Sequence, residues 1–243
     1  MVRKVICDIL ILVCLIALIF AGLQIYQYWK DSQKSEEIFE ELRDDPKDDI
    51  SKAWKENHDT VGWIKIPKTK VDYPVMQNKK EPQFYLHKDF NKKESLRGCL
   101  FVDAKTDLKV SKNILIYGHH MLDGTMFGDL VKYSDPSYFK SHKKIKYTFI
   151  DEHGRKEHRK YRVIAMFKSV TTDQDSFLDY ANIEDSETYE KYMNLIRTKS
   201  EVSFDEPVYP TELLTLSTCS YHLPRWAENF HKGRFCVIAV RTK

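Results

Sequence analysis

Two stretches decide the fold of this chain: residues 213–219, LLTLSTC, and residues 234–241, RFCVIAVR, which follow after a polar loop. Both are short apolar runs rich in residues that favour buried β-strands. If they pair antiparallel through the loop of residues 220–233, Arg234 lies beside Cys219 at one edge of the sheet. We therefore predict a thiol and a guanidinium together at a strand end, where they can face a groove.

The same kind of strand-like pattern extends back to Val61. Short apolar runs separated by turn residues recur at VGWIKIP, VDYPVM, GCLFVDA, NILIYG, IKYTFID and KYRVIAMFKSV. This pattern predicts a mainly β domain, a barrel or a sandwich, over residues 61–243. Residues 151–154, DEHG, are expected to form a hairpin turn. Helical spacing predicts one helix over about residues 185–199, inserted before the penultimate strand, with its apolar face made of Tyr189, Tyr192, Met193 and Ile196.

The first 28 residues predict a membrane anchor. Residues 9–25 are almost wholly apolar and, with residues 5–7, approach the roughly 20 residues that a transmembrane helix needs. Arg3 and Lys4 precede this run, so the N-terminus is expected in the cytoplasm and the rest of the chain outside the cell. A cleaved signal peptide is the alternative, although no clear cleavage site follows. An outer aromatic belt would consist of Tyr26, Tyr28 and Trp29.

Residues 29–60 are strongly charged and predict a helical stalk. Ile38, Phe39 and Leu42 have helical spacing, and Pro46 is expected to break the helix. We expect this segment to be a solvated spacer between the membrane and a single catalytic domain.

Charge and cysteine content narrow the function. The 39 basic and 36 acidic residues nearly balance, which argues against a nucleic-acid-binding protein. Cys7 and Cys14 lie in or beside the apolar N-terminal run, which leaves Cys99, Cys219 and Cys236 outside it. Three thiols cannot all pair internally, so at least one is free. Cys99 and Cys236 are expected in the core, and Cys219 is the candidate nucleophile.

Histidine and arginine complete a possible catalytic set. The run NILIYGHH ends a predicted strand at Tyr117, with His119 just beyond it. A thiolate that attacks a carbonyl needs a histidine to move protons and a cationic donor to hold the oxyanion. His120 is a rival to His119, and Arg225 is a rival to Arg234. His87 is expected at the surface, with a place near the substrate groove as the alternative.

These residues carry a family resemblance. TLSTC at 215–219, YGHHMLDGTMF at 117–127 and RFCVIAV at 234–240 resemble the three active-site motifs of sortases, and the inserted helix resembles class B best. The resemblance implies an eight-stranded β-barrel with N-terminal helices. It also implies Cys219 as nucleophile, His119 as acid and base, and Arg234 as oxyanion donor. Substrate contacts are expected from Leu86, Ser217 and Thr218.

In function, the resemblance implies a cysteine transpeptidase. Such an enzyme cleaves an NPxTx-like sorting motif near the C-terminus of a secreted protein and forms a thioester. An amine of a cell-wall precursor, or of a pilin, then resolves it. The alternatives are another exported Cys/His/Arg acyltransferase, such as an L,D-transpeptidase, or a catalytically silent membrane-tethered binding module. Zinc ligation by His119, His120, Cys219 and His222 lacks the usual paired spacing, so we predict no metal and no cofactor.

Overall fold

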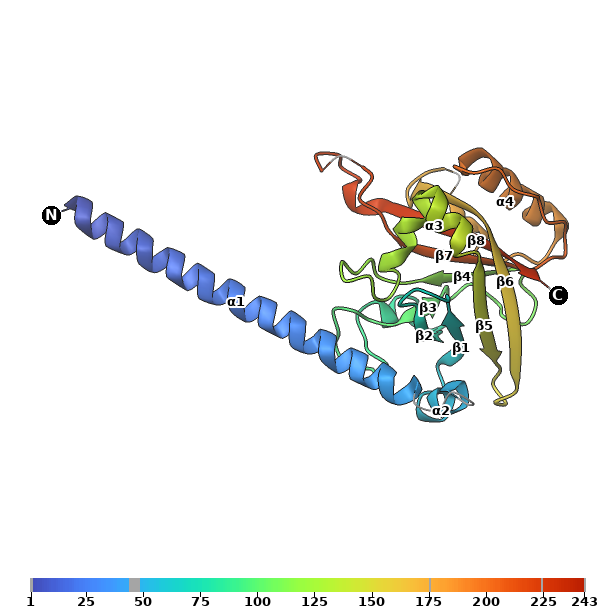
Figure 1. Cartoon of the computed structure of the whole chain (residues 1–243), viewed down its shortest axis with the longest axis horizontal. Coiled ribbons are helices and arrows are strands. Elements are labelled where there is room, and N and C mark those ends of the chain that lie inside the picture. The colour runs from blue at the N-terminus through green and yellow to red at the C-terminus, as the bar shows by residue number, and fades with distance from the viewer. Residues whose placement is uncertain (1, 44–48, 175, 224, 243) are drawn as a thin grey trace.

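The computed structural model describes residues 2–43, 49–174, 176–223 and 225–242 (Figure 1). Pro46, where a helix break was predicted, lies outside these residues. So do the side chains of Arg3 and Lys4, on which the predicted orientation depends, and that of Tyr28. A long helix projects from a β-barrel that carries a shorter helix on its outer surface.

Eight strands close into one barrel, as the sortase resemblance implies. Their order around the barrel is β1, β2, β3, β4, β7, β8, β6, β5. The β2–β3 and β4–β7 pairs are parallel, and the others are antiparallel. The strands are β1 (Thr60–Lys65), β2 (Asp72–Met76), β3 (Leu100–Val102), β4 (Asn113–Tyr117), β5 (Lys144–Ile150), β6 (Lys156–Val170), β7 (Leu213–Cys219) and β8 (Gly233–Thr242). The predicted turn at residues 151–154 joins β5 to β6.

The helices lie outside the barrel wall. They are α1 (Val2–Arg43), α2 (Asp49–Glu56), α3 (Pro136–Ser141) and α4 (Ser186–Lys199), with 3-10 turns η1 (Phe84–Leu86), η2 (Gly128–Ser134), η3 (Phe177–Tyr180) and η4 (Phe230–Lys232). The predicted inserted helix is confirmed as α4, whose N-cap Asp185 accepts from the Thr188 amide at 2.7 Å. We did not predict α3, although Asp135 caps it and Pro136 opens it, a common helix start.

The helix α1 contains the apolar N-terminal segment and also docks on the barrel. Residues 6–27 form a 22-residue stretch that is long and apolar enough to cross a membrane. Farther along, Phe39 and Leu42 are each only 1% exposed, and Arg43 lies over the ring of Tyr73. Burial of each apolar side chain contributes about 1.5–3 kcal/mol. The solvated spacer expected here is therefore wrong for the last turns of α1, which pack against the catalytic domain.

Alternation along β7 decides which side chains reach the outer surface of the barrel. Leu214 and Leu216 belong to the interior core, whereas Leu213 belongs to the cluster beneath α4. On that outer face the Tyr192 hydroxyl of α4 lies 2.7 Å from Thr215 Oγ1. Because side chains in a strand alternate, Cys219 shares this outer face with Leu213 and Thr215.

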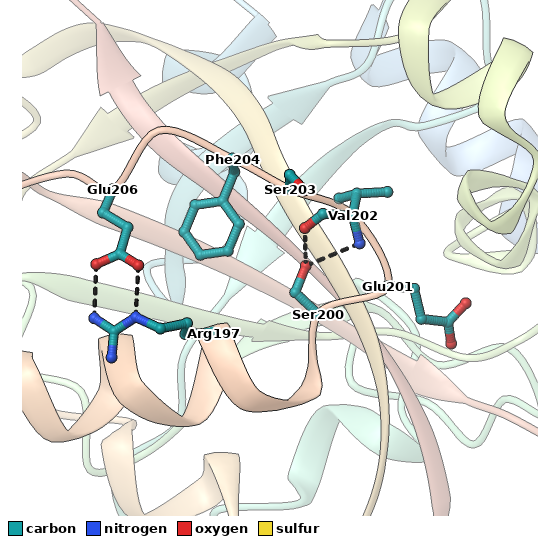
Figure 2. A pocket seen from close by; sticks show the side chains of 7 residues that line it. All are labelled: Arg197, Ser200, Glu201, Val202, Ser203, Phe204 and Glu206. Atoms are coloured by element: carbon teal, nitrogen blue, oxygen red, sulfur yellow. Dashed lines mark hydrogen bonds and ion pairs between the residues drawn. The ribbon is translucent and has the colours of Figure 1, made fainter.

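The segment between α4 and β7 is fastened at its start. Figure 2 shows Ser200 Oγ donating to the Val202 carbonyl at 2.7 Å and accepting from the Val202 amide at 3.2 Å. Arg197 pairs with both carboxylate oxygens of Glu206, at 2.6 and 2.7 Å. This fork-shaped pairing fixes geometry better than a single contact does. The insert is thus held as a defined feature on the outer face of the barrel.

Candidate functional site

Strand register brings the predicted thiol and guanidinium together. In the antiparallel β7–β8 pair Cys219 lies opposite Arg234. In the parallel β4–β7 pair Tyr117 lies opposite Ser217, so His119 follows β4 at the same end of the sheet. The predicted antiparallel pairing of β7 with β8 is confirmed, and three strand ends meet at one edge.

A groove of about 470 Å³ opens over these strand ends. It contains all six predicted site residues: Leu86, His119, Ser217, Thr218, Cys219 and Arg234. The β2–β3 connection forms one wall, and the segment between β6 and α4 contributes to another. We did not predict the other lining residues, which are Pro82, Gln83, Phe101, Asp103, Lys105, Tyr117, Gly118, Thr171 and Leu178.

Accessibility separates Cys219 from the other thiols of the barrel. Cys99 and Cys236 are 1% and 0% exposed, which confirms their predicted place in the core. Burial raises the pKa of the Cys99 thiol well above its ordinary value and that of Cys236 to about 12. Both thiols are therefore held in the poorly nucleophilic protonated form. Cys219 is partly exposed and lines the groove.

A main-chain carbonyl orients His119. Its Nε2 lies 2.8 Å from the Leu86 carbonyl oxygen, and because a carbonyl only accepts, Nε2 carries the proton. Nδ1 is then the nitrogen that can accept a proton. Burial lowers the pKa of His119, the Leu86 carbonyl partly opposes this, and the charges of His87 and Arg234 lower it further. The His87 ring, although exposed as predicted, is centred 5.9 Å from that of His119.

The neighbouring histidine has different contacts. The His120 ring stacks on Tyr221 of the β7–β8 loop, with centroids 5.7 Å apart. Among the described residues, His120 is not part of the groove lining. The structure thus brings His119, and not His120, into the groove with Cys219.

A hydrogen bond from Thr218 joins the two halves of the site. Thr218 Oγ1 donates to the Gly118 carbonyl at 2.8 Å, and both residues are buried. A Cβ at Gly118 would lie 2.3 Å from the Leu100 side chain and 2.7 Å from that of Phe127, so this close approach requires glycine. The Thr218 hydroxyl proton is used in this hydrogen bond to Gly118, directly after β4. The bond therefore supports the segment that leads from β4 to His119.

Arg234 keeps donors available for a ligand. Nη1 donates to the main-chain carbonyls of His231 at 3.1 Å and Gly233 at 2.9 Å. Within the described part of the chain these are the hydrogen bonds of the guanidinium, so Nε and Nη2 can donate into the groove. Arg225, the rival arginine, is exposed in the β7–β8 loop and is not among the described groove residues.

The groove wall also contains a carboxylate that we did not predict. The Tyr117 hydroxyl donates to Asp103 Oδ2 at 2.6 Å. Burial, and then the Asp103 charge, raises the pKa of Tyr117, so the phenol stays protonated as a donor. Tyr117 lies opposite Phe101 in the antiparallel β3–β4 pair, which brings it near Asp103 just after β3. Finding this pair from sequence would require knowing that β3 pairs with β4.

The free energy of unfolding should decrease at acidic pH, because three histidines have lowered pKa values in the folded protein. Burial lowers the folded-state pKa of His119, His120 and His222 below 6.5, so the unfolded chain binds protons more readily. Stability is then full above about pH 6.5 and decreases as pH falls from there toward the folded pKa values. We expect a smaller free energy of unfolding at about pH 5.5 than at pH 7.5, measured by urea unfolding in detergent micelles. His119→Gln should reduce this pH difference, and an unchanged difference would contradict the burial effect.

The chain matches the family model "Sortase domain" over residues 64–242. It is 31% identical to sortase B of Staphylococcus aureus over 194 residues, which cover 79% of this chain and 76% of that protein. It is 30% identical to sortase B of Listeria monocytogenes, over 86% of this chain and 78% of that protein.

Solved structures agree with this match. The crystal structure of Clostridium perfringens sortase B superimposes with a TM-score of 0.68 at 29% identity, covering 79% of this chain and 98% of that one. The Staphylococcus aureus sortase B–substrate complex does so with a TM-score of 0.67 at 27% identity, covering 91% and 97%. These matches favour a sortase over the L,D-transpeptidase and silent-module alternatives. The chain belongs to the sortase family and is a class B-like cysteine transpeptidase.

Proposed function

We propose that the protein cleaves an NPxTx-like sorting motif of secreted proteins and transfers the acyl group to an amine of a cell-wall precursor. A pilin amine is the second possible acceptor. The observation that carries this proposal is the register that sets Cys219 opposite Arg234, with His119 in the same groove.

The groove residues divide the chemistry among them. The Cys219 thiolate attacks the main-chain carbonyl carbon of the motif threonine. The resulting oxyanion accepts a hydrogen bond from Nε or Nη2 of Arg234. His119, protonated, donates to the departing amine, which leaves a thioester on Cys219. The incoming amine attacks this thioester and gives its proton to His119, and the thiolate departs. The proton that His119 accepts in the second step replaces the one that it donated in the first.

The groove walls suit an extended peptide. Leu86 from the β2–β3 connection and Leu178 from the segment between β6 and α4 contribute apolar side chains to the groove, and Ser217 of β7 contributes a hydroxyl-bearing one. We assign Leu86, Ser217 and Thr218 to substrate contact because they line the groove beside Cys219.

Membrane attachment is part of the proposal. Residues 6–27 would cross the bilayer with the N-terminus in the cytoplasm, which places the barrel outside the cell. Tyr26 and Trp29 are exposed near the end of this stretch, with ring centroids 6.4 Å apart, as in an interfacial aromatic belt. Protease added to intact cells should remove a C-terminal epitope tag, whereas protection of the tag would contradict this orientation.

The reaction class is tested with the full chain in detergent micelles and a fluorogenic NPQTN-type peptide. Cleavage should occur with peptide alone, and added triglycine should yield a new amide between the motif threonine and glycine, detected by mass spectrometry. A peptide with the motif order reversed is the control and should remain intact. Cleavage without any amide product would contradict transpeptidation.

A further inference from the structure

A buried arginine joins three separate parts of the chain. Arg97, in the β2–β3 connection, is 4% exposed. Its Nη1 lies 3.4 Å from Glu36 Oε2 on α1, and its Nη2 lies 2.5 Å from Asp123 Oδ2 in the loop after His119. Among the described residues Arg97 is not part of the groove lining, so any effect on catalysis must pass through its neighbours.

One route to His119 runs along the backbone. Gly98 has a φ of +57°, and a Cβ there would lie 2.4 Å from the Tyr85 carbonyl oxygen and 2.6 Å from that of Leu86. The backbone at Gly98 therefore packs closely against the Leu86 carbonyl, which is the group that accepts from His119 Nε2. A shift at Arg97 moves Gly98 and hence the acceptor that orients the imidazole.

A second route runs through the loop of residues 119–127. The Phe127 amide donates to the His119 carbonyl at 3.0 Å, which closes the base of this loop. Near its tip, Asp123 Oδ1 accepts from the amide and the hydroxyl of Thr125 at 3.0 and 2.5 Å. Arg97 holds the other oxygen of the same carboxylate. Arg97 thus contacts the loop that begins with His119, and its chain neighbour Gly98 lies against the Leu86 carbonyl that binds the imidazole.

The α1 helix supplies the third support. Glu36 provides the second carboxylate for Arg97 and also pairs with Arg43. Ser35 Oγ lies 3.4 Å from Ser95 Oγ in the same β2–β3 connection. A buried guanidinium is costly when a counter-charge is removed, so the docking of α1 and the position of Arg97 depend on each other.

We propose that Arg97 is a positioning residue that uses Glu36 of α1 and Asp123 to hold His119 in its productive orientation. The extracellular end of the anchor helix is then part of the active-site support. This inference rests on the proposed role of His119.

Charge-neutral and conservative variants of the full chain test it. Glu36→Gln and Asp123→Asn keep shape but remove a counter-charge, and Arg97→Lys keeps charge but loses the planar fork. We expect kcat for peptide cleavage to fall about 10- to 100-fold, as for a slightly misplaced catalytic group, with KM little changed. Arg155→Gln is the matched control, because it removes an exposed pair with Asp151 on the β5–β6 turn, and it should retain full activity.

A second readout does not depend on turnover. The Leu86 carbonyl raises the pKa of His119, while burial, His87 and Arg234 lower it. Displacement of the carbonyl in Arg97→Lys or Glu36→Gln should therefore lower the His119 pKa further, measured by NMR titration of the imidazole and assigned with His119→Gln. An unchanged titration and unchanged kcat in both variants would overturn this inference. Full activity of Cys219→Ala in the same assay would instead overturn the proposed function.

Discussion

Cys219→Ala is expected to reduce cleavage of the sorting peptide to below about one part in 10⁴ of the wild-type rate, as loss of a catalytic nucleophile does. Without the thiol no thioester forms, and the remaining groove has no other accessible thiol among the described residues. Peptide cleavage gives the rate, and intact-protein mass spectrometry gives the acyl adduct, which should be present in the wild type and absent from the variant.

Cys236→Ala is the matched control for this result. Cys236 lies two residues from Arg234 on β8, but its side chain is wholly buried in the cluster beneath α4. Its loss should leave cleavage within about twofold of wild type, apart from a modest decrease in stability from the small cavity. An adduct on Cys99 or Cys236, or full cleavage by Cys219→Ala, would show that the nucleophile is assigned wrongly.

His119→Ala should lower kcat by about 10²- to 10⁴-fold, the usual contribution of a general acid and base. His119 lines the groove and is oriented by the Leu86 carbonyl, and in the proposed mechanism its ring exchanges protons with the leaving and entering amines. Single-turnover measurements separate the two steps. Both the acylation of Cys219 and the aminolysis of the thioester should be slowed.

His120→Ala provides the comparison within the same loop. Its ring stacks on Tyr221, so its loss should loosen the β7–β8 loop and change kcat by no more than about tenfold. If His120→Ala were the more damaging of the two changes, the proton-transfer role would belong to His120. A similar moderate loss in both variants would indicate that neither ring transfers the proton.

The elements that could be predicted from sequence are those set by local pattern. Alternating apolar runs and turn residues predict the strands, and the i, i+3, i+4, i+7 spacing predicts α4. The pairing of Cys219 with Arg234 also followed, because two consecutive apolar strands joined by one loop were expected to pair antiparallel. The roles of His119, Cys219 and Arg234 depended on the family resemblance.

What could not be predicted depends on contacts between distant segments. The docking of Phe39 and Leu42 requires a complementary barrel surface that no local pattern describes. The Tyr117–Asp103 pair requires the β3–β4 register, and the Leu86 carbonyl that orients His119 belongs to main chain, which has no sequence signature. Charged composition alone predicted a spacer, but composition does not reveal which face of a helix is buried.

The position of β8 in the barrel has a consequence for when the enzyme becomes active. β8 follows β7 along the chain, yet it also pairs with β6, and β4 pairs with β7 through residues such as Asn113 and Leu213. Pairings so distant in sequence form slowly, because much chain entropy is lost before they contribute stability. A polypeptide that emerges N-terminus first therefore lacks Arg234 opposite Cys219 until β8 pairs with β7. With Arg234 as the proposed oxyanion donor, acylation of Cys219 then requires that β8 has joined the barrel.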